Sequence, residues 1–203
     1  MTEREYKYLV GEEELRLVEK VLESEQQGLT EKVQINYYYD TMGGDLRRRG
    51  ITLRVRQTGG RLSLQYERRL DTGDIFRVSE EVSLPLERLC AAIRLPDKLF
   101  PRYDAAGREE EPPACVLQGS LTTWRRSYLL KGGITVELDR SSYLGVYDCE
   151  IEVEFPDGKE NEAKQLTARL GLRRIPCSKE GKAERFFKLK KRVDDCSITV
   201  REQ

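Results

Sequence analysis

The sequence predicts an α+β fold in which about eight antiparallel strands close into a β-barrel with a polar interior and helices packed outside. Three observations support this prediction. Most of the chain consists of short segments in which polar and apolar residues alternate, as they do in strands. Glycine-containing turns separate neighbouring segments. The charges on the polar faces are sorted by segment, because some segments carry mainly acids and others mainly arginines.

The first half of the chain is predicted to contain a helix followed by a series of strands. Residues 12–27 place apolar side chains at helical spacing. Residues 50–70 are typical of a hairpin that turns at Gly59-Gly60. A second helix is expected over residues 86–106. The other segments that are rich in β-forming residues are 3–10, 33–41 and 75–84.

The second half repeats this organisation. Its predicted strands are 120–130, 133–144 and 147–155. A helix is expected over residues 160–172, and the basic segment 181–193 also favours a helix. The pattern shows no linker, so we expect a single domain over residues 1–193, followed by a flexible tail over residues 194–203.

The composition restricts the classes of function. The 203 residues include 36 basic and 36 acidic side chains, and this balance argues against a protein that binds nucleic acid through bulk charge. The chain has no histidine, so imidazole is excluded as a general base and as a metal ligand. Its five cysteines form no C-x-x-C pair, which argues against a zinc site and favours a reduced, cytoplasmic setting. The chain has no apolar run long enough to span a membrane, so no membrane association is expected.

Several strands are predicted to carry charges at every second position. Because alternate residues share a face of a strand, each of the following sets lies on one face: Glu3, Glu5 and Lys7; Arg54 and Arg56; Glu137 and Asp139; Glu150, Glu152 and Glu154. An ordinary sheet with one solvated face would explain any single strand. Adjacent like charges destabilise a sheet, however, and clustered carboxylates indicate a bound divalent cation. Inside a barrel, such carboxylates and cations would bind a metal-bound polyanion.

Six blocks of the chain resemble, in order, the signature of the CYTH superfamily, also called triphosphate tunnel metalloenzymes. The first block, Glu3-x-Glu5-x-Lys7, resembles the ExExK motif of that family. The others are YYDT at 38–41, LRVR at 53–56, ELD at 137–139, EIEVE at 150–154 and KAERF at 182–186. The resemblance covers residues 3–187, and its NYYYDT and GSLTT segments are most similar to bacterial YjbK-like members.

The resemblance implies an antiparallel eight-stranded tunnel that binds a triphosphate compound with Mg²⁺ or Mn²⁺. Family members hydrolyse inorganic tripolyphosphate or thiamine triphosphate, or cyclise ATP to cyclic AMP. For this chain the resemblance implies a cytoplasmic, metal-dependent triphosphatase that acts on a small-molecule substrate, as a monomer or a homodimer. It implies no nucleic-acid partner and no membrane association.

The resemblance also assigns roles to individual residues. The expected metal ligands are Glu3, Glu5, Asp139, Glu150 and Glu152, while Glu154 is expected to lie beyond the metal. The expected phosphate-binding residues are Lys7, Arg54, Arg56, Arg125, Lys182 and Arg185. The residues expected to take part in catalysis are Glu150, Glu152 and Lys7. Arginine suits phosphate binding because its guanidinium group binds two phosphate oxygens at once. No covalent nucleophile is expected, because phosphoryl transfer to water does not need one.

Two departures from the family pattern leave alternatives open. Many relatives carry a lysine where this chain has Gln65, and a lysine or a small residue near Trp124. The alternatives are an adenylyl cyclase or a thiamine triphosphatase of the same fold, and a non-catalytic binder of polyphosphate or nucleotides. No segment marks a purine site, which favours hydrolysis of inorganic tripolyphosphate. The sequence leaves open whether Glu80 or Glu81 faces the interior.

Overall fold

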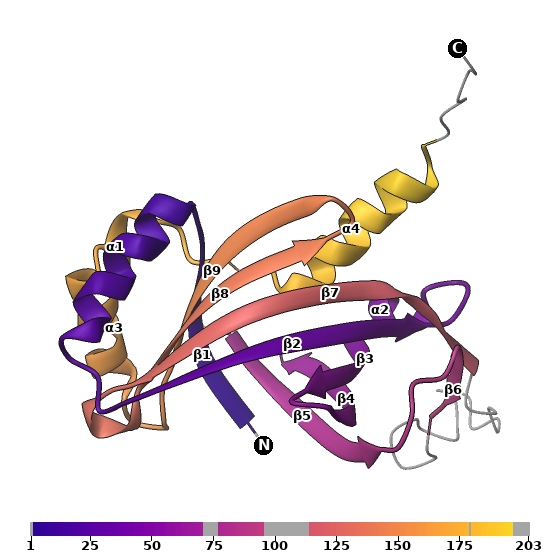
Figure 1. The fold of residues 1–203 in the computed structure, drawn as a ribbon, viewed down its shortest axis with the longest axis horizontal. Coiled ribbons are helices and arrows are strands. Elements are labelled where there is room, and N and C mark those ends of the chain that lie inside the picture. Colours follow the sequence, from indigo (N-terminus) through magenta and orange to yellow (C-terminus); the bar gives the residue numbers. More distant parts are fainter. Residues whose placement is uncertain (1, 71–76, 96–113, 179, 197–203) are drawn as a thin grey trace.

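The computed structural model describes residues 2–70, 77–95, 114–178 and 180–196, without the side chains of residues 2, 3, 69, 70 and 77–82. Figure 1 shows an antiparallel sheet flanked by helices. The strands are β1 (Thr2–Val10), β2 (Gly28–Asp40), β3 (Ile51–Thr58), β4 (Arg61–Leu70), β5 (Arg77–Leu86), β6 (Ala92–Arg94), β7 (Ala114–Leu129), β8 (Thr135–Tyr143) and β9 (Val146–Glu154). The helices are α1 (Glu12–Glu23), α2 (Asp45–Arg48), α3 (Glu160–Arg169) and α4 (Lys182–Asp194), with 3₁₀ turns η2 (Lys131–Gly133) and η3 (Leu172–Arg174). None of these helices is both long and apolar enough to cross a membrane.

The prediction of a closed eight-stranded barrel is wrong. Within the described ranges the sheet has nine strands in the order β2-β3-β4-β5-β1-β9-β8-β7-β6, and it ends at β6 as an edge strand. An additional pairing between β2 and β7 curves the sheet, so that it has an inner and an outer face. Strand β7 extends beyond the residues that pair with β8, and its first residues pair with β6. Alternation within one segment does not reveal how far a strand extends past its partner, so the sequence does not predict the ninth strand.

Most of the other predicted elements are confirmed. The hairpin of residues 50–70 corresponds to β3 and β4, and Gly59 and Gly60 adopt the positive φ angles (55° and 79°) that its tight turn requires. The three predicted helices that correspond to α1, α3 and α4 are those at 12–27, 160–172 and 181–193. The helix expected over residues 86–106 is wrong in its described part, which contains β6.

The outer face of the sheet carries most of the apolar core. Helices α1 and α3 lie side by side against β1, β8 and β9 (Figure 1). Leu15, Val18 and Leu22 recur on one side of α1 and are buried against sheet residues that include Ile151 and Val153. A second cluster covers the outer face of β2, β3 and β4 and includes Leu46 of α2. Because both clusters lie outside, the polar residues of the same strands are directed to the inner face.

One end of the inner face is apolar. Tyr38 of β2 and Tyr143 of β8 pack there against Phe186 and Phe187 of α4. The ring of Phe186 is fully buried, and its centroid lies 4.9 Å from that of Tyr38. At Gly119 a Cβ atom would lie only 2.8 Å from the Phe186 ring, so glycine allows α4 to approach β7. Helix α4 therefore covers this end of the inner face and places its first turn beside the polar residues.

Candidate active site

The polar inner face of the sheet lines a pocket of about 210 Å³. Strands β1, β2, β3, β7 and β9 contribute alternate residues to this pocket, and α4 contributes its first turn. Strands β3 and β9 lie four strands apart in the sheet order, so their side chains face each other across the pocket. Three carboxylates on one side come from β1 and β9, whereas the opposite side has two arginines from β3 and the Glu67 carboxylate from β4. The pocket therefore has an acidic side and a basic side.

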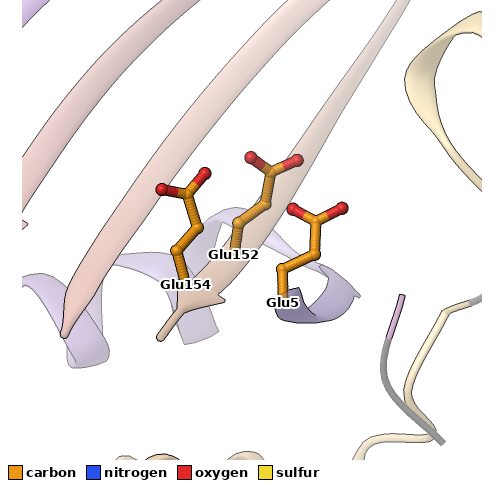
Figure 2. A group of neighbouring side chains, drawn as sticks. All are labelled: Glu5, Glu152 and Glu154. Carbon is orange, nitrogen blue, oxygen red and sulfur yellow. The ribbon is translucent and has the colours of Figure 1, made fainter. Parts of the chain in front are cut away.

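Three carboxylates meet on the acidic side (Figure 2). Glu5 on β1 lies opposite Glu154 on β9, and Glu152 lies two residues away on the same face of β9. Each of the three offers one oxygen, and these oxygens all lie within 4.8 Å of one another. Hard divalent cations prefer carboxylate oxygens, so this donor set fits Mg²⁺ or Mn²⁺.

A second group of carboxylates lies deeper. Asp139 on β8 and Glu150 on β9 are opposite each other in the strand register, and neither is exposed to solvent. Together with Glu152 they also bring one oxygen each within 4.8 Å. Among the described residues, Glu152 lines the pocket, whereas Asp139 and Glu150 do not. Glu152 is thus common to both groups and connects the pocket to the buried acids.

Lys7 lies between the two carboxylate groups. Its Nζ atom lies 3.1 Å from Glu150 and 3.4 Å from Glu5, and it also forms an ion pair with Glu152. Burial opposes the charged form of this lysine, but the three carboxylates outweigh that effect and raise its pKa. Lys7 therefore remains a cation on a face that is otherwise acidic.

Two further cations neutralise the deeper group. Lys182, at the start of α4, lies 2.7 Å from Asp139 and 2.9 Å from Glu152, and it also contacts Glu150. Arg125 on β7 lies opposite Asp139 in the register and donates two hydrogen bonds to it, at 2.6 and 2.5 Å. The same guanidinium lies 2.7 Å from Glu152. Each phosphate-binding candidate on this side therefore contacts at least one carboxylate.

The surrounding cations keep the buried acids ionised. Burial disfavours the charged form of Glu152, but Lys182, Lys7 and Arg125 outweigh it and hold the pKa of this carboxyl well below its usual range. Burial likewise opposes ionisation of Asp139, and Arg125 and Lys182 reverse that effect and lower its pKa. Both groups are carboxylates at neutral pH, which is the form that binds a cation.

These shifts are expected to make the fold sensitive to acid. The ordinary pKa values of Glu152 and Asp139 are 4.5 and 3.8, and both are lowered in the folded chain. A carboxyl with a lowered pKa stabilises the fold fully above its ordinary pKa, and that contribution is lost as the pH falls through the folded value. The free energy of unfolding should therefore change little between pH 7 and about 5 and should decrease below about pH 4. Denaturant titrations across this range test the prediction, and the decrease should be shallower in Asp139→Asn; an equal slope in that variant would contradict it.

The arginines of β3 are held by polar groups on the neighbouring strands. Arg54 Nε donates to Gln65 Oε1 at 2.8 Å, and the same guanidinium lies 3.3 Å from Glu67. Arg56 Nε donates to Asn36 Oδ1 at 2.9 Å. Both arginines line the pocket. Gln65 therefore orients an arginine with its amide oxygen and adds no positive charge.

Arg185 differs from the other predicted phosphate-binding residues. Its guanidinium lies 2.9 Å from Asp148 and 2.7 Å from Glu150, and it also donates to the backbone oxygen of Glu180. Within the described part of the chain, the residues that line the pocket include Lys182 but not Arg185. Arg185 therefore attaches α4 to β9, while Lys182, one turn earlier, reaches the pocket.

The structure brings most of the predicted site residues together. Those that line the pocket are Glu5, Lys7, Arg54, Arg56, Arg125, Glu152 and Lys182. Asp139 and Glu150 lie behind them. The backbone of Glu3 lies in β1, but its side chain is outside the described residues. The side chains of Glu80 and Glu81 are also outside them, although the register places Glu81 opposite Glu67 of the pocket.

Two residues lie at or beside the pocket although the sequence did not predict it, and a third lies on the opposite face. Glu154, expected beyond the metal, belongs to the carboxylate group at the pocket. Lys32 lies on the inner face next to that pocket. The predicted strand 33–41 began one residue too late to include Lys32. The alternation of Lys32 with Gln34 and Asn36 is the signal that would have predicted its position. Trp124 itself is 50% exposed on the outer face, whereas its neighbours Thr123 and Arg125 line the pocket.

Comparisons with known proteins agree with this fold. A family model described as the CYTH domain matches residues 1–187. A Hippeastrum protein, assigned as an adenylyl cyclase and reported to have a dominant triphosphatase activity, is 20% identical, with a TM-score of 0.68 over 92% of this chain and 95% of that one. A candidate adenylate cyclase from Bacillus halodurans is 21% identical, with a TM-score of 0.61 over 90% and 96%. A conserved hypothetical protein from Pyrococcus furiosus is 18% identical, with a TM-score of 0.59 over 90% and 98%. No curated protein matches the chain in sequence.

Proposed function

Since the chain belongs to the CYTH domain family, we propose that it is a divalent-metal-dependent hydrolase of a triphosphate, most simply inorganic tripolyphosphate. The observation that carries this proposal is the combination, in one pocket, of three converging carboxylates and a set of lysines and arginines. Carboxylates suit a hard cation, and guanidinium and ammonium groups suit phosphate oxygens. The pocket volume of about 210 Å³ is below the range of roughly 300–1,000 Å³ that is usual for drug-sized ligands, which supports a compact substrate without a nucleoside.

The residues proposed to hold the cation at the pocket are Glu5, Glu152 and Glu154. When bound, the cation would neutralise phosphate charge and make a water molecule more acidic. Asp139 and Glu150 would support this site from behind, because they fix the cations that contact Glu152. This arrangement supports roles for Glu5, Asp139, Glu150 and Glu152 of the predicted acidic set, with Glu154 added to them.

The lysines and Arg125 would bind the phosphate chain from the acidic side. Each now contacts carboxylates, so substrate binding would require them to exchange one anion for another. Lys7 and Lys182 would exchange Glu152 for phosphate more readily when the charge of Glu152 is neutralised by a divalent cation. Binding of metal and of polyphosphate should therefore be cooperative.

Hydrolysis would depend on orientation and charge rather than on a covalent intermediate. Arg54 and Arg56 would bind phosphate oxygens from the basic side and so hold the chain across the pocket. Lys7 would bind the oxygens of the reacting phosphate next to Glu152, and Glu150, at 3.1 Å from its ammonium group, would position it. Strict positioning of this kind accounts for much of the rate enhancement in phosphoryl transfer.

Release of phosphate from tripolyphosphate in the presence of Mg²⁺ or Mn²⁺ tests the proposal. The proposal would be wrong if neither metal supports turnover above a reaction without protein. Tight calorimetric binding of tripolyphosphate without turnover would instead indicate a non-catalytic polyphosphate binder. Formation of cyclic AMP from ATP would indicate an adenylyl cyclase.

A further inference from the structure

Lys32 is a partly buried cation on the inner face of β2. It shares this face with Gln34 and Asn36, which both line the pocket, because alternate residues of a strand point the same way. In the register of β2 with β7 it lies opposite Arg125. Lys32 therefore places a second cation beside Arg125 on this face.

The partners of Lys32 differ from those of the other inner lysines. Lys7 and Lys182 each contact three carboxylates, whereas Lys32 forms no ion pair with any of the described residues. Burial, together with the nearby charges of Arg125 and Arg56, lowers its pKa, and the nearby carboxylates of Asp139 and Glu154 only partly offset this effect. A cation in such surroundings destabilises the fold unless an anion neutralises it. The surroundings of Lys32 therefore indicate that an anionic ligand binds beside it.

The position of Lys32 along β2 shows which part of a ligand it would meet. The apolar cluster under α4 lies at Tyr38, and the pocket-lining residues Gln34 and Asn36 follow toward the start of the strand. Pairing of β2 with β3 ends where Gln34 lies opposite Thr58, so Lys32 lies past the end of the β3–β4 hairpin. A linear polyanion that extends from the pocket away from the apolar cluster would reach Lys32.

We propose that Lys32 is a phosphate-positioning residue that binds the outermost group of a linear chain of three or more phosphates. This inference rests on the proposed function and narrows its substrate class. A pyrophosphate bound by Lys7, Lys182 and Arg54 would not extend to Lys32. A longer chain would gain a charge-assisted hydrogen bond there, so Lys32 would select substrates by chain length.

Calorimetry of Lys32→Gln with pyrophosphate and with tripolyphosphate, each in the presence of Mg²⁺, tests this inference. Loss of a hydrogen bond between charged groups should weaken tripolyphosphate binding about tenfold or more, and pyrophosphate binding less than about twofold. Lys32→Arg should retain most of the affinity for tripolyphosphate. Lys131→Gln, which removes an exposed lysine from η2, is the matched control and should change neither affinity.

A second measurement separates a binding role from a structural one. Because burial and two arginines disfavour its charge, Lys32→Gln should raise the melting temperature without ligand while it weakens tripolyphosphate binding, and a lower melting temperature would indicate a structural role instead. Equal loss of affinity for both anions, or no loss for tripolyphosphate, would contradict the inference while leaving the proposed function intact. If the wild-type protein binds neither anion, the proposed function fails as well.

Discussion

Replacing Glu152 with glutamine is expected to reduce metal-dependent hydrolysis of tripolyphosphate by about 100-fold or more. Glu152 belongs to both carboxylate groups and lines the pocket. Glutamine preserves the size of the side chain but removes the negative charge that a divalent cation requires. Phosphate release at several Mg²⁺ concentrations would measure the loss, and the concentration needed for half-maximal activity should also rise.

The same substitution should lower stability, because Glu152 is buried among Lys7, Lys182 and Arg125. Loss of one partner from such a buried network costs about 3–5 kcal/mol of the free energy of unfolding. Thermal unfolding of the variant is therefore needed to show that it is folded during the assay. Glu13→Gln, at an exposed position of α1, is the matched control and should retain activity. Full activity of folded Glu152→Gln would exclude the proposed metal site.

Phe186→Ala is expected to lower the free energy of unfolding by about 3–5 kcal/mol, the cost of an aromatic ring removed from a core without full collapse of the cavity. The ring is fully buried and packs against Tyr38, Tyr143 and Phe187. Denaturant titration measures the change. Since the ring also holds α4 over the inner face, Lys182 should be less well positioned, and KM for tripolyphosphate should rise.

Val193→Ala is a control on the same helix, because that side chain is 48% exposed and its removal should cost less than about 0.5 kcal/mol. Phe186→Leu should be intermediate, since it retains part of the buried volume. A loss below about 1 kcal/mol in Phe186→Ala would show that α4 does not depend on the apolar cluster.

Alternation of polar and apolar residues predicted most strands and the face on which the charges lie. This signal is local, because the geometry of a strand places every second residue on the same side. Glu5, Lys7 and Glu152 could therefore be assigned to one face before any contact between β1 and β9 was known. The turn at Gly59 was predictable for a similar reason, since few residues other than glycine accept its backbone angles.

The extent and pairing of strands were less predictable. The short β6 and the first residues of β7 are defined by their pairing with each other, between segments 20 to 24 residues apart in the chain. Neither segment shows in its own pattern where its partner ends. The mistaken closed eight-stranded barrel follows from counting segments without this information.

The amino-acid sequence alone determines which side chains this protein can direct to one face of its sheet, because strand periodicity is a property of the local backbone. The tertiary structure determines which of those side chains work together. Glu154 joins Glu5 through the register of β1 with β9, and Arg185 anchors α4 through Asp148 and Glu150. Charge pairs form over a few ångströms between residues far apart in the chain, so their partners depend on how the whole sheet curves.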